Sequence, residues 1–116
     1  MHELQVTERI LNIVLQHAKG QDVSRIIRIH LRVGELSDLE DEWIQHYFDY
    51  LSRGTMAENA QLAITRAPII ARCDSCACSF EVKRDALGDA TCPQCAEQRL
   101  ELVSGSGYFI ENMEVL

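Results

Sequence analysis

The sequence predicts an α+β fold in which two helices pack on a small mixed three-stranded sheet, with a four-cysteine zinc ribbon inserted. Stretches of helical period and stretches of period two alternate in the outer part of the chain, which predicts the helices and the sheet. Two Cys-x-x-Cys pairs, Cys73/Cys76 and Cys92/Cys95, are separated by fifteen residues and predict the ribbon. A chain of 116 residues with 47% apolar content can bury one modest core beside such a metal-stabilised unit.

The first helix is predicted from about residue 4 to residue 18. Apolar side chains recur there at intervals of three and four, and Lys19-Gly20 provides a stop. A period-two pattern then runs to Gly34 and predicts a strand with one apolar and one polar, solvent-facing side. The apolar side holds Ile27, Ile29, Leu31 and Val33, and the polar side holds Arg28, His30 and Arg32.

A second helix is predicted to start at Ser37-Asp38-Leu39-Glu40, which matches the capping-box pattern, and to stop at Gly54. In this interpretation Glu40 is the acidic residue at the third helical position. The predicted apolar face consists of Trp43, Ile44, Tyr47, Phe48 and Leu51.

The next strand is predicted from Leu62 to Ile70, interrupted near Pro68, where the missing N–H indicates an edge or a strand end. After the ribbon, residues 104–107 form a flexible Ser/Gly connector, and residues 108–115 form a last strand. Strands on either side of the insertion can pair. The sequence therefore predicts an outer α+β domain, residues 1–71 plus 104–116, and a zinc-ribbon domain, residues 72–103.

Four thiolates complete the tetrahedral coordination of Zn²⁺, so a site of Cys73, Cys76, Cys92 and Cys95 is expected to be structural rather than catalytic. The alternative is two disulfides, but no apolar signal segment indicates an oxidising compartment. Cys78, the fifth cysteine, is interpreted as a small, partly buried side chain rather than a spare ligand.

The charge of the chain argues against several classes of function. The formal net charge is −7, and Zn²⁺ held by four thiolates would bring it to about −9. This opposes phosphate and nucleic-acid binding, and no apolar run approaches the ~20 residues that span a membrane. The sequence has no glycine-rich phosphate loop and no G-x-S-x-G motif, so an enzyme is not expected. These features predict a cytoplasmic protein.

The start of the chain, Met1-His2-Glu3, holds a second set of possible metal ligands. A free α-amine, the amide nitrogen of His2 and its imidazole Nδ1 can form adjacent chelate rings around one ion. The Glu3 amide or an outside ligand can complete a square, a geometry that suits Ni²⁺ and also Cu²⁺. The alternative is that His2 belongs to an ordinary frayed terminus.

Several motifs together resemble the HypA/HybF family of hydrogenase nickel-incorporation proteins, and the match runs from end to end. They are Met1-His2-Glu3-Leu4, Gly34-Glu35-Leu36-Ser37, Gly54-Thr55, both Cys-x-x-Cys turns and Met113-Glu114-Val115. The resemblance implies a metallochaperone with structural Zn²⁺ that carries Ni²⁺ as transient cargo to the [NiFe]-hydrogenase large subunit precursor. It implies a HypB-type GTPase as partner and leaves urease maturation proteins open as further recipients.

The resemblance also implies the nickel ligands: His2, the α-amine of Met1, and the backbone amides of His2 and Glu3. The side chains of Glu3 and Glu40 match acidic positions near the nickel in the family. Each has an alternative, because Glu3 can be a first-turn acid of helix one and Glu40 the capping-box acid of helix two. The other histidines, His17, His30 and His46, are expected to be ordinary surface or hydrogen-bonded residues.

This sequence departs from the family at the residue after each Cys-x-x-Cys, where Ala77 and Ala96 replace glycine. If alanine adopts the left-handed turn, the cost is about 1–2 kcal/mol for each, against about 10–16 kcal/mol contributed by structural zinc. The zinc site is therefore expected to form. The alternative function is a zinc-ribbon adaptor that does not bind nickel.

Overall fold

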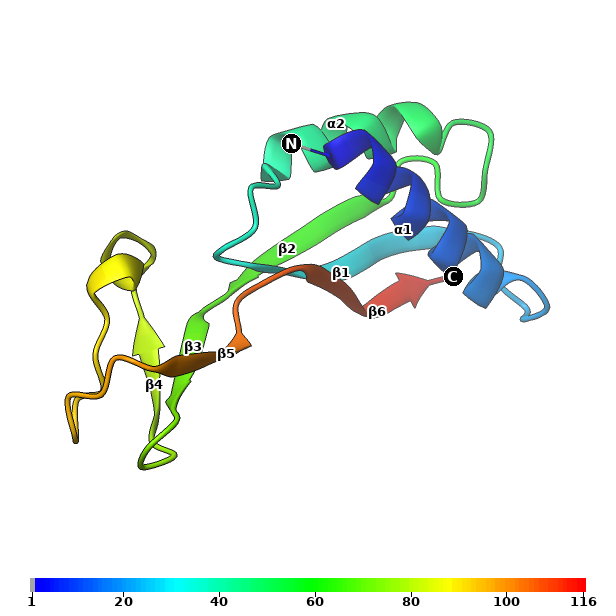
Figure 1. The fold of residues 1–116 in the computed structure, drawn as a ribbon. Coiled ribbons are helices and arrows are strands. Elements are labelled where there is room, and N and C mark those ends of the chain that lie inside the picture. The colour runs from blue at the N-terminus through cyan, green and yellow to red at the C-terminus, as the bar shows by residue number, and fades with distance from the viewer. Residues whose placement is uncertain (1) are drawn as a thin grey trace. The chain divides into compact units, whose positions relative to one another are not determined.

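The computed structural model of the protein describes residues 2–116 and contains two three-stranded sheets (Figure 1). The helices are α1 (Glu3–Ala18), α2 (Asp41–Leu51) and the short 3-10 helix η1 (Arg84–Asp89). The strands are β1 (Ile26–Gly34), β2 (Gln61–Ala67), β3 (Ile69–Cys73), β4 (Ser79–Val82), β5 (Leu100–Ser104) and β6 (Tyr108–Val115). The strand orders are β2-β1-β6 and β4-β3-β5, so the α+β fold with an inserted cysteine ribbon is confirmed.

The chain divides into two compact units. The helical unit consists of Met1–Arg32, Asp38–Thr65 and Phe109–Leu116, and the ribbon unit consists of Val33–Ser37 and Arg66–Tyr108. The units and the predicted domains divide the chain at different residues. The ribbon unit extends beyond residues 72–103 on both sides, and it also takes in residues 33–37 from the segment between β1 and α2.

The core of the helical unit lies between the two helices and one face of its sheet (Figure 1). Helices α1 and α2 pack against each other, and the predicted bounds of the first helix are confirmed. On β1 the predicted alternation is confirmed at Ile29 and Leu31, which are fully buried on either side of the half-buried His30. It is wrong at the start of the strand, where Ile26 is buried and Ile27 is half-buried. The main buried side chains of this core are Ile10, Leu11, Val14, Ile26, Ile29, Leu31, Ile44 and Phe48.

The predicted capping box at the start of α2 is wrong. The helix begins at Asp41 with Glu40 as its N-cap, and the Glu40 side chain makes no capping hydrogen bond. Ser37 lies in the turn after β1, where its N–H donates to the carbonyl of Gly34 at 3.0 Å. The N–H of Glu40 instead donates to the carboxylate of Glu3, 3.0 Å away on α1. In a capping box the Ser37 hydroxyl would accept the hydrogen bond from the N–H of Glu40. Here the carboxylate of Glu3, a residue remote in sequence, accepts it instead.

The apolar face of α2 is narrower than predicted. Ile44 and Phe48 are buried, and Tyr47 and Leu51 are half-buried. Trp43 is 47% exposed, so the prediction that it belongs to the core face is wrong. The ring of Trp43 lies against those of His46 and Tyr47 rather than in the core.

The predicted strand break at Pro68 is confirmed. Strand β2 ends at Ala67 in one sheet, and β3 begins at Ile69 in the other. Proline has no N–H to donate to a strand ladder, which favours a strand end at this position. Beyond it, β3 pairs in antiparallel fashion with both β4 and β5.

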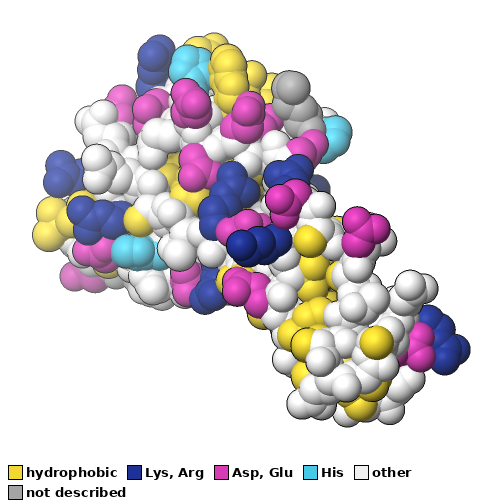
Figure 2. All heavy atoms as spheres, turned by 90° about the vertical axis from the view of Figure 1, so that its left-hand side faces the viewer, with side chains coloured by type: hydrophobic (Ala, Val, Ile, Leu, Met, Phe, Trp, Pro, Cys, Tyr) yellow, Lys and Arg dark blue, Asp and Glu magenta, His cyan; other side chains and the backbone are white. Residues whose placement is uncertain are grey.

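The ribbon unit has little apolar material of its own. Its buried cluster consists of Ile69, Ala71 and Val82, with Leu36, Phe80, Ala90 and Leu100 packed partly against it. Other apolar side chains of this unit remain exposed, and Figure 2 shows hydrophobic side chains gathered over it. So small a core rarely stabilises a fold without a disulfide or a metal.

Two glycines let the backbone of the ribbon unit cross itself at close range. A Cβ at Gly34 would stand 2.1 Å from the carbonyl oxygen of Gly105, and one at Gly105 would stand 2.7 Å from the Cα of Ile69. Backbone hydrogen bonds close the crossing, from Gly34 N–H to Gly107 and from Leu36 N–H to Gly105, both at 2.8 Å. The predicted connector of residues 104–107 is therefore packed against the segment that follows β1.

Gly34→Ala is expected to destabilise the protein by about 3 kcal/mol, the upper end of the usual cost of overpacking, because backbone rather than a movable side chain blocks the new methyl group. Urea unfolding followed by circular dichroism measures the change. Gly88→Ala is the matched control, since a Cβ at Gly88 would have nothing within 4 Å, and it should stay within about 0.5 kcal/mol of the parent. Equal midpoints for the two variants would contradict the close crossing.

Candidate metal sites

Two similar turns hold the four cysteines. Cys73 ends β3, and Cys76 follows in the turn before β4; Cys92 and Cys95 form the second turn, after η1. In the first turn the N–H of Ala77 donates to the carbonyl of Cys73 at 3.0 Å, and in the second the N–H of Ala96 donates to that of Cys92 at 2.8 Å. The same Cys-x-x-Cys spacing thus folds the same way twice.

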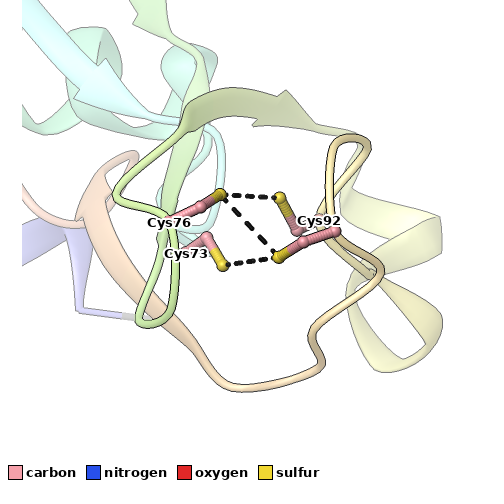
Figure 3. A group of neighbouring side chains, drawn as sticks. Cys73, Cys76 and Cys92 are labelled. Carbon is pink, nitrogen blue, oxygen red and sulfur yellow. Dashed lines mark hydrogen bonds between the residues drawn. The ribbon is translucent and has the colours of Figure 1, made fainter.

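The four sulfurs lie close together and point toward one another (Figure 3). All four Sγ atoms are within 4.8 Å of each other, with 3.5 Å between Cys73 and Cys95 and 3.5 Å between Cys76 and Cys92. Zn–S bonds of about 2.3 Å in a tetrahedron place the sulfurs about 3.8 Å apart. All five cysteines are free rather than disulfide-bonded, so the arrangement fits a tetrahedral ion with four thiolate ligands.

Backbone N–H groups direct positive dipoles at this cluster. Ser75 N lies 3.3 Å from Cys73 Sγ, and Gln94 N lies 3.4 Å from Cys92 Sγ. Although burial raises the thiol pKa of Cys92, hydrogen bonds from the backbone of Cys95 and Gln94 outweigh it and lower that pKa to about 6. For Cys76, a backbone hydrogen bond from Cys78 lowers the pKa, but the bond shared with Cys92 and partial burial raise it to about 12. A metal that takes all four thiolates must therefore displace protons.

Ala77 and Ala96 both adopt the left-handed backbone conformation, with φ of 62° and 61°. The left-handed turn that the sequence left open for these two alanines is thus present at both. A Cβ in this region costs about 1–2 kcal/mol, so both turns carry strain that glycine would relieve.

Ala77→Gly and Ala96→Gly are each expected to stabilise the ribbon unit by about 0.5–1 kcal/mol, because relief of strain exceeds the entropy that glycine adds to the unfolded chain. The measurement is the rate at which a chelator removes the metal, which should slow in each variant. Ala86→Gly, in η1 and away from these turns, is the control and should not slow removal. Faster removal from Ala77→Gly would contradict the strain.

Glu97 fastens the second turn. Its carboxylate accepts hydrogen bonds from the backbone and side chain of Arg99 and from the Ser75 hydroxyl, which lower its pKa to about 2.

Cys78 stays outside the metal cluster, as expected, and is half-buried. The pKa of the Cys78 thiol is raised, mainly because the side chain is partly buried and to a lesser extent because of the nearby charge of Cys92.

The predicted nickel ligand from the Met1 amine lies outside the described residues. His2 is exposed and acts as the N-cap of α1, where its carbonyl accepts a hydrogen bond from the N–H of Val6 at 3.0 Å. Glu3 begins the helix, and N–H groups of a first helical turn have no acceptor within the helix. The imidazole of His2 and the amide of Glu3, two of the predicted nickel ligands, thus both lie at the N-terminal end of α1.

The structure brings the two predicted acidic residues together, but through the backbone of one of them. Glu3 is only 4% exposed, and its Oε2 accepts the hydrogen bond from the N–H of Glu40. The Glu40 side chain is exposed, and the carbonyl of Glu3 accepts a hydrogen bond from the Thr7 hydroxyl. No local pattern predicts this link between the starts of α1 and α2, because its two ends are 37 residues apart.

The three remaining histidines lie elsewhere. His17 is exposed in the last turn of α1, and His46 stacks edge-on against Trp43. His30 Nε2 lies 2.7 Å from the carboxylate of Glu114. Arg28, and then His30, lower the pKa of Glu114 below its ordinary value. Among the described residues, the four-cysteine cluster is the group of histidine, cysteine and acidic side chains arranged to hold a metal.

Comparisons with known proteins place these features in a family context. The family model described as hydrogenase/urease nickel incorporation, metallochaperone, hypA matches residues 1–115. A hydrogenase maturation factor HypA from Dehalococcoides mccartyi is 36% identical over 115 residues, covering 99% of this chain and 94% of the relative. Another HypA, from Azotobacter vinelandii, is 34% identical over 99% of both chains.

Solved structures show the same fold. The solution structure of the Ni metallochaperone HypA from Helicobacter pylori matches with a TM-score of 0.70 at 21% identity, over 100% of this chain and 98% of that one. A second solution structure of a HypA protein matches with a TM-score of 0.77, also at 21% identity, over 100% and 97%. No helix within residues 2–116 has the length and apolar character needed to cross a bilayer.

Proposed function

The chain belongs to the HypA family of hydrogenase/urease nickel-incorporation metallochaperones, and we propose that it binds one Ni²⁺ at its N-terminus and delivers it for [NiFe]-hydrogenase maturation. The observation that carries the proposal is the family match over residues 1–115, which includes the Met1-His2-Glu3 start.

The proposed nickel ligands are the Met1 amine, the imidazole of His2 and the backbone amides of His2 and Glu3. Nitrogen ligands in a plane suit Ni²⁺. The exposure of His2 and the place of Glu3 at the head of α1 support this set. The Glu3 carboxylate is proposed to lie near the ion without binding it. Its role there is to link the start of α1 to α2 through the hydrogen bond from the N–H of Glu40.

The proposed ion in the cysteine cluster is Zn²⁺, with a structural role. Four-coordinate thiolate sites of this spacing are typical of zinc, and Cys73, Cys76, Cys92 and Cys95 leave no open position for substrate or water. Such a closed site stabilises the ribbon unit and does not act as a catalyst. Together with the family, this supports a cytoplasmic carrier without enzymatic activity.

Release of nickel is proposed to proceed by ligand exchange. A site made from a chain end and one side chain can lose its ligands one at a time to a partner, which a closed four-thiolate cage cannot do readily. The proposed partners are a HypB-type GTPase and the hydrogenase large subunit precursor, with urease maturation proteins as further candidates because the family description includes urease.

Metal analysis of protein that starts at Met1 without a tag tests the proposal. We expect one tightly held zinc per chain, plus one nickel taken up in calorimetric titration with the absorption spectrum of a planar nitrogen site. Uptake of zinc alone would favour the adaptor function instead. Nickel found among the thiolates, or in an octahedral oxygen environment, would refute the proposed N-terminal site.

A further inference from the structure

An aromatic stripe runs along the exposed side of α2. Trp43, His46, Tyr47 and Tyr50 follow the spacing i, i+3, i+4 and i+7, so they share one helix face. Trp43 is 47% exposed and Tyr50 is 63% exposed, while Tyr47 is half-buried. Three of the seven aromatic Phe, Tyr and Trp residues of the chain thus lie on one short surface.

The rings of Trp43, His46 and Tyr47 form a contiguous cluster. The ring centroids of Trp43 and Tyr47 are 5.8 Å apart, and His46 lies edge-on to both at 5.6 Å. At the far end the guanidinium of Arg53 lies 5.4 Å from the centroid of Tyr50. One cationic side chain of the protein itself therefore already stacks on this surface, as cation–π attraction favours.

Acidic residues flank the aromatic stripe. Residues 40–51, which comprise α2 and its N-cap, contain four carboxylates and no lysine or arginine. Glu42 and Asp49 are exposed and precede Trp43 and Tyr50 directly in the sequence. In the upper part of Figure 2, where α2 lies, acidic side chains gather beside hydrophobic ones, a histidine and a basic side chain.

We propose that the aromatic stripe of α2 is a docking surface for a partner protein that presents arginine or lysine side chains around an apolar centre. Charge complementarity selects this occupant. Guanidinium groups can stack on the rings and pair with Glu42 and Asp49, whereas a nucleic acid or an anionic membrane would be repelled by the same carboxylates. Exposed tryptophan and tyrosine are the residue types that most often dominate protein interfaces.

This inference rests on the proposed function and deepens it, because it assigns the surface through which a partner is held. The N-cap of α2 is tied to α1 by the hydrogen bond from Glu40 to the Glu3 carboxylate, and His2 precedes Glu3 directly. A protein docked on the beginning of α2 therefore lies near the proposed nickel ligands. Docking and nickel transfer can then take place in one complex.

The test measures binding of the nickel-loaded full chain to the purified HypB-type GTPase and, separately, to the hydrogenase large subunit precursor. Trp43→Ala and Tyr50→Ala are each expected to weaken at least one of these complexes by about tenfold or more. Glu42→Lys combined with Asp49→Lys should slow association with the partner. Added salt should likewise slow the association of the parent protein with the same partner. Phe109→Ala on β6, where the side chain is 54% exposed, is the matched control and should leave both affinities within about twofold.

The single tryptophan of the chain gives a direct readout. With 5-fluorotryptophan at position 43, the one ¹⁹F resonance should shift when the partner binds. Unchanged affinity for both partners in Trp43→Ala and Tyr50→Ala, or an unshifted resonance in the complex, would overturn the proposal. So would failure of both partners to bind the parent, or a dimer of this chain that Trp43→Ala dissociates.

The nickel titration separates this inference from the function on which it rests. Trp43→Ala should bind nickel like the parent, because Trp43 contributes no proposed ligand. Loss of nickel binding in the parent itself would refute the proposed function. Intact nickel binding with partner affinities that do not respond to the stripe would refute the docking surface alone.

Discussion

Cys92→Ser should abolish stoichiometric zinc binding and unfold the ribbon unit. Cys92 is 2% exposed, and its Sγ stands 3.5 Å from that of Cys76, so serine removes a ligand from the interior of the cluster. Structural zinc contributes about 10–16 kcal/mol in small metal-dependent units. The buried cluster of Ile69, Ala71 and Val82 is too small to offset such a loss.

Two measurements check this outcome. Metal analysis should find no zinc in Cys92→Ser, and NMR should lose the dispersed amide resonances of β3, β4 and β5. The methyl resonances of Ile10 and Ile29 should stay dispersed, because these residues belong to the core of the helical unit. Cys78→Ser is the control and should keep its zinc, since Cys78 is not part of the cluster. One zinc per chain in both variants would show that the four sulfurs do not hold it.

His2→Ala should abolish tight nickel binding and leave the zinc content unchanged. The imidazole is a proposed direct ligand, so its loss should exceed the roughly 10–100-fold effect typical of residues that only support a ligand. Residues added before Met1 should have the same effect, because they move the α-amine away from His2. Nickel affinity in the parent should also weaken as pH falls, since protons compete for the same nitrogens.

Isothermal titration of nickel into each variant measures these effects. His17→Ala is the matched control, as His17 is also an exposed histidine of α1 but lies in its last turn. It should bind nickel like the parent. An unchanged affinity in His2→Ala, or in the extended chain, would discard the N-terminal site.

The features that can be predicted well from sequence are those set by neighbouring residues. The Cys-x-x-Cys turns close as expected because each turn is made by residues within its own few positions, and their hydrogen bonds repeat from one turn to the other. The alternation along β1 from Arg28 onward depends on local period, and the strand end at Pro68 depends on a missing N–H, so both are also predictable.

The features that sequence does not predict depend on distant residues. The start of α2 differs from the prediction because Glu3, on another helix, accepts the hydrogen bond that the capping pattern assigns locally. Trp43 has the spacing of a core residue, and periodicity alone does not determine how wide the buried face of a helix will be. The crossing of Gly34 and Gly105 joins positions that no local pattern relates.

The path of the chain through the ribbon unit limits how this protein can be cut and recombined. Residues 33–37 contribute backbone donors that bond to Ala67, Gly105 and Gly107, although they precede the cysteine segment by a whole helix. Excising residues 66–108 would leave the N–H groups of Gly34, Glu35 and Leu36 without their hydrogen-bond acceptors. Grafting that stretch onto another scaffold would leave the corresponding carbonyl groups without their donors. Residues 66–108 therefore depend on residues 34–36 for their backbone pairing and are not expected to fold intact as an independent insert.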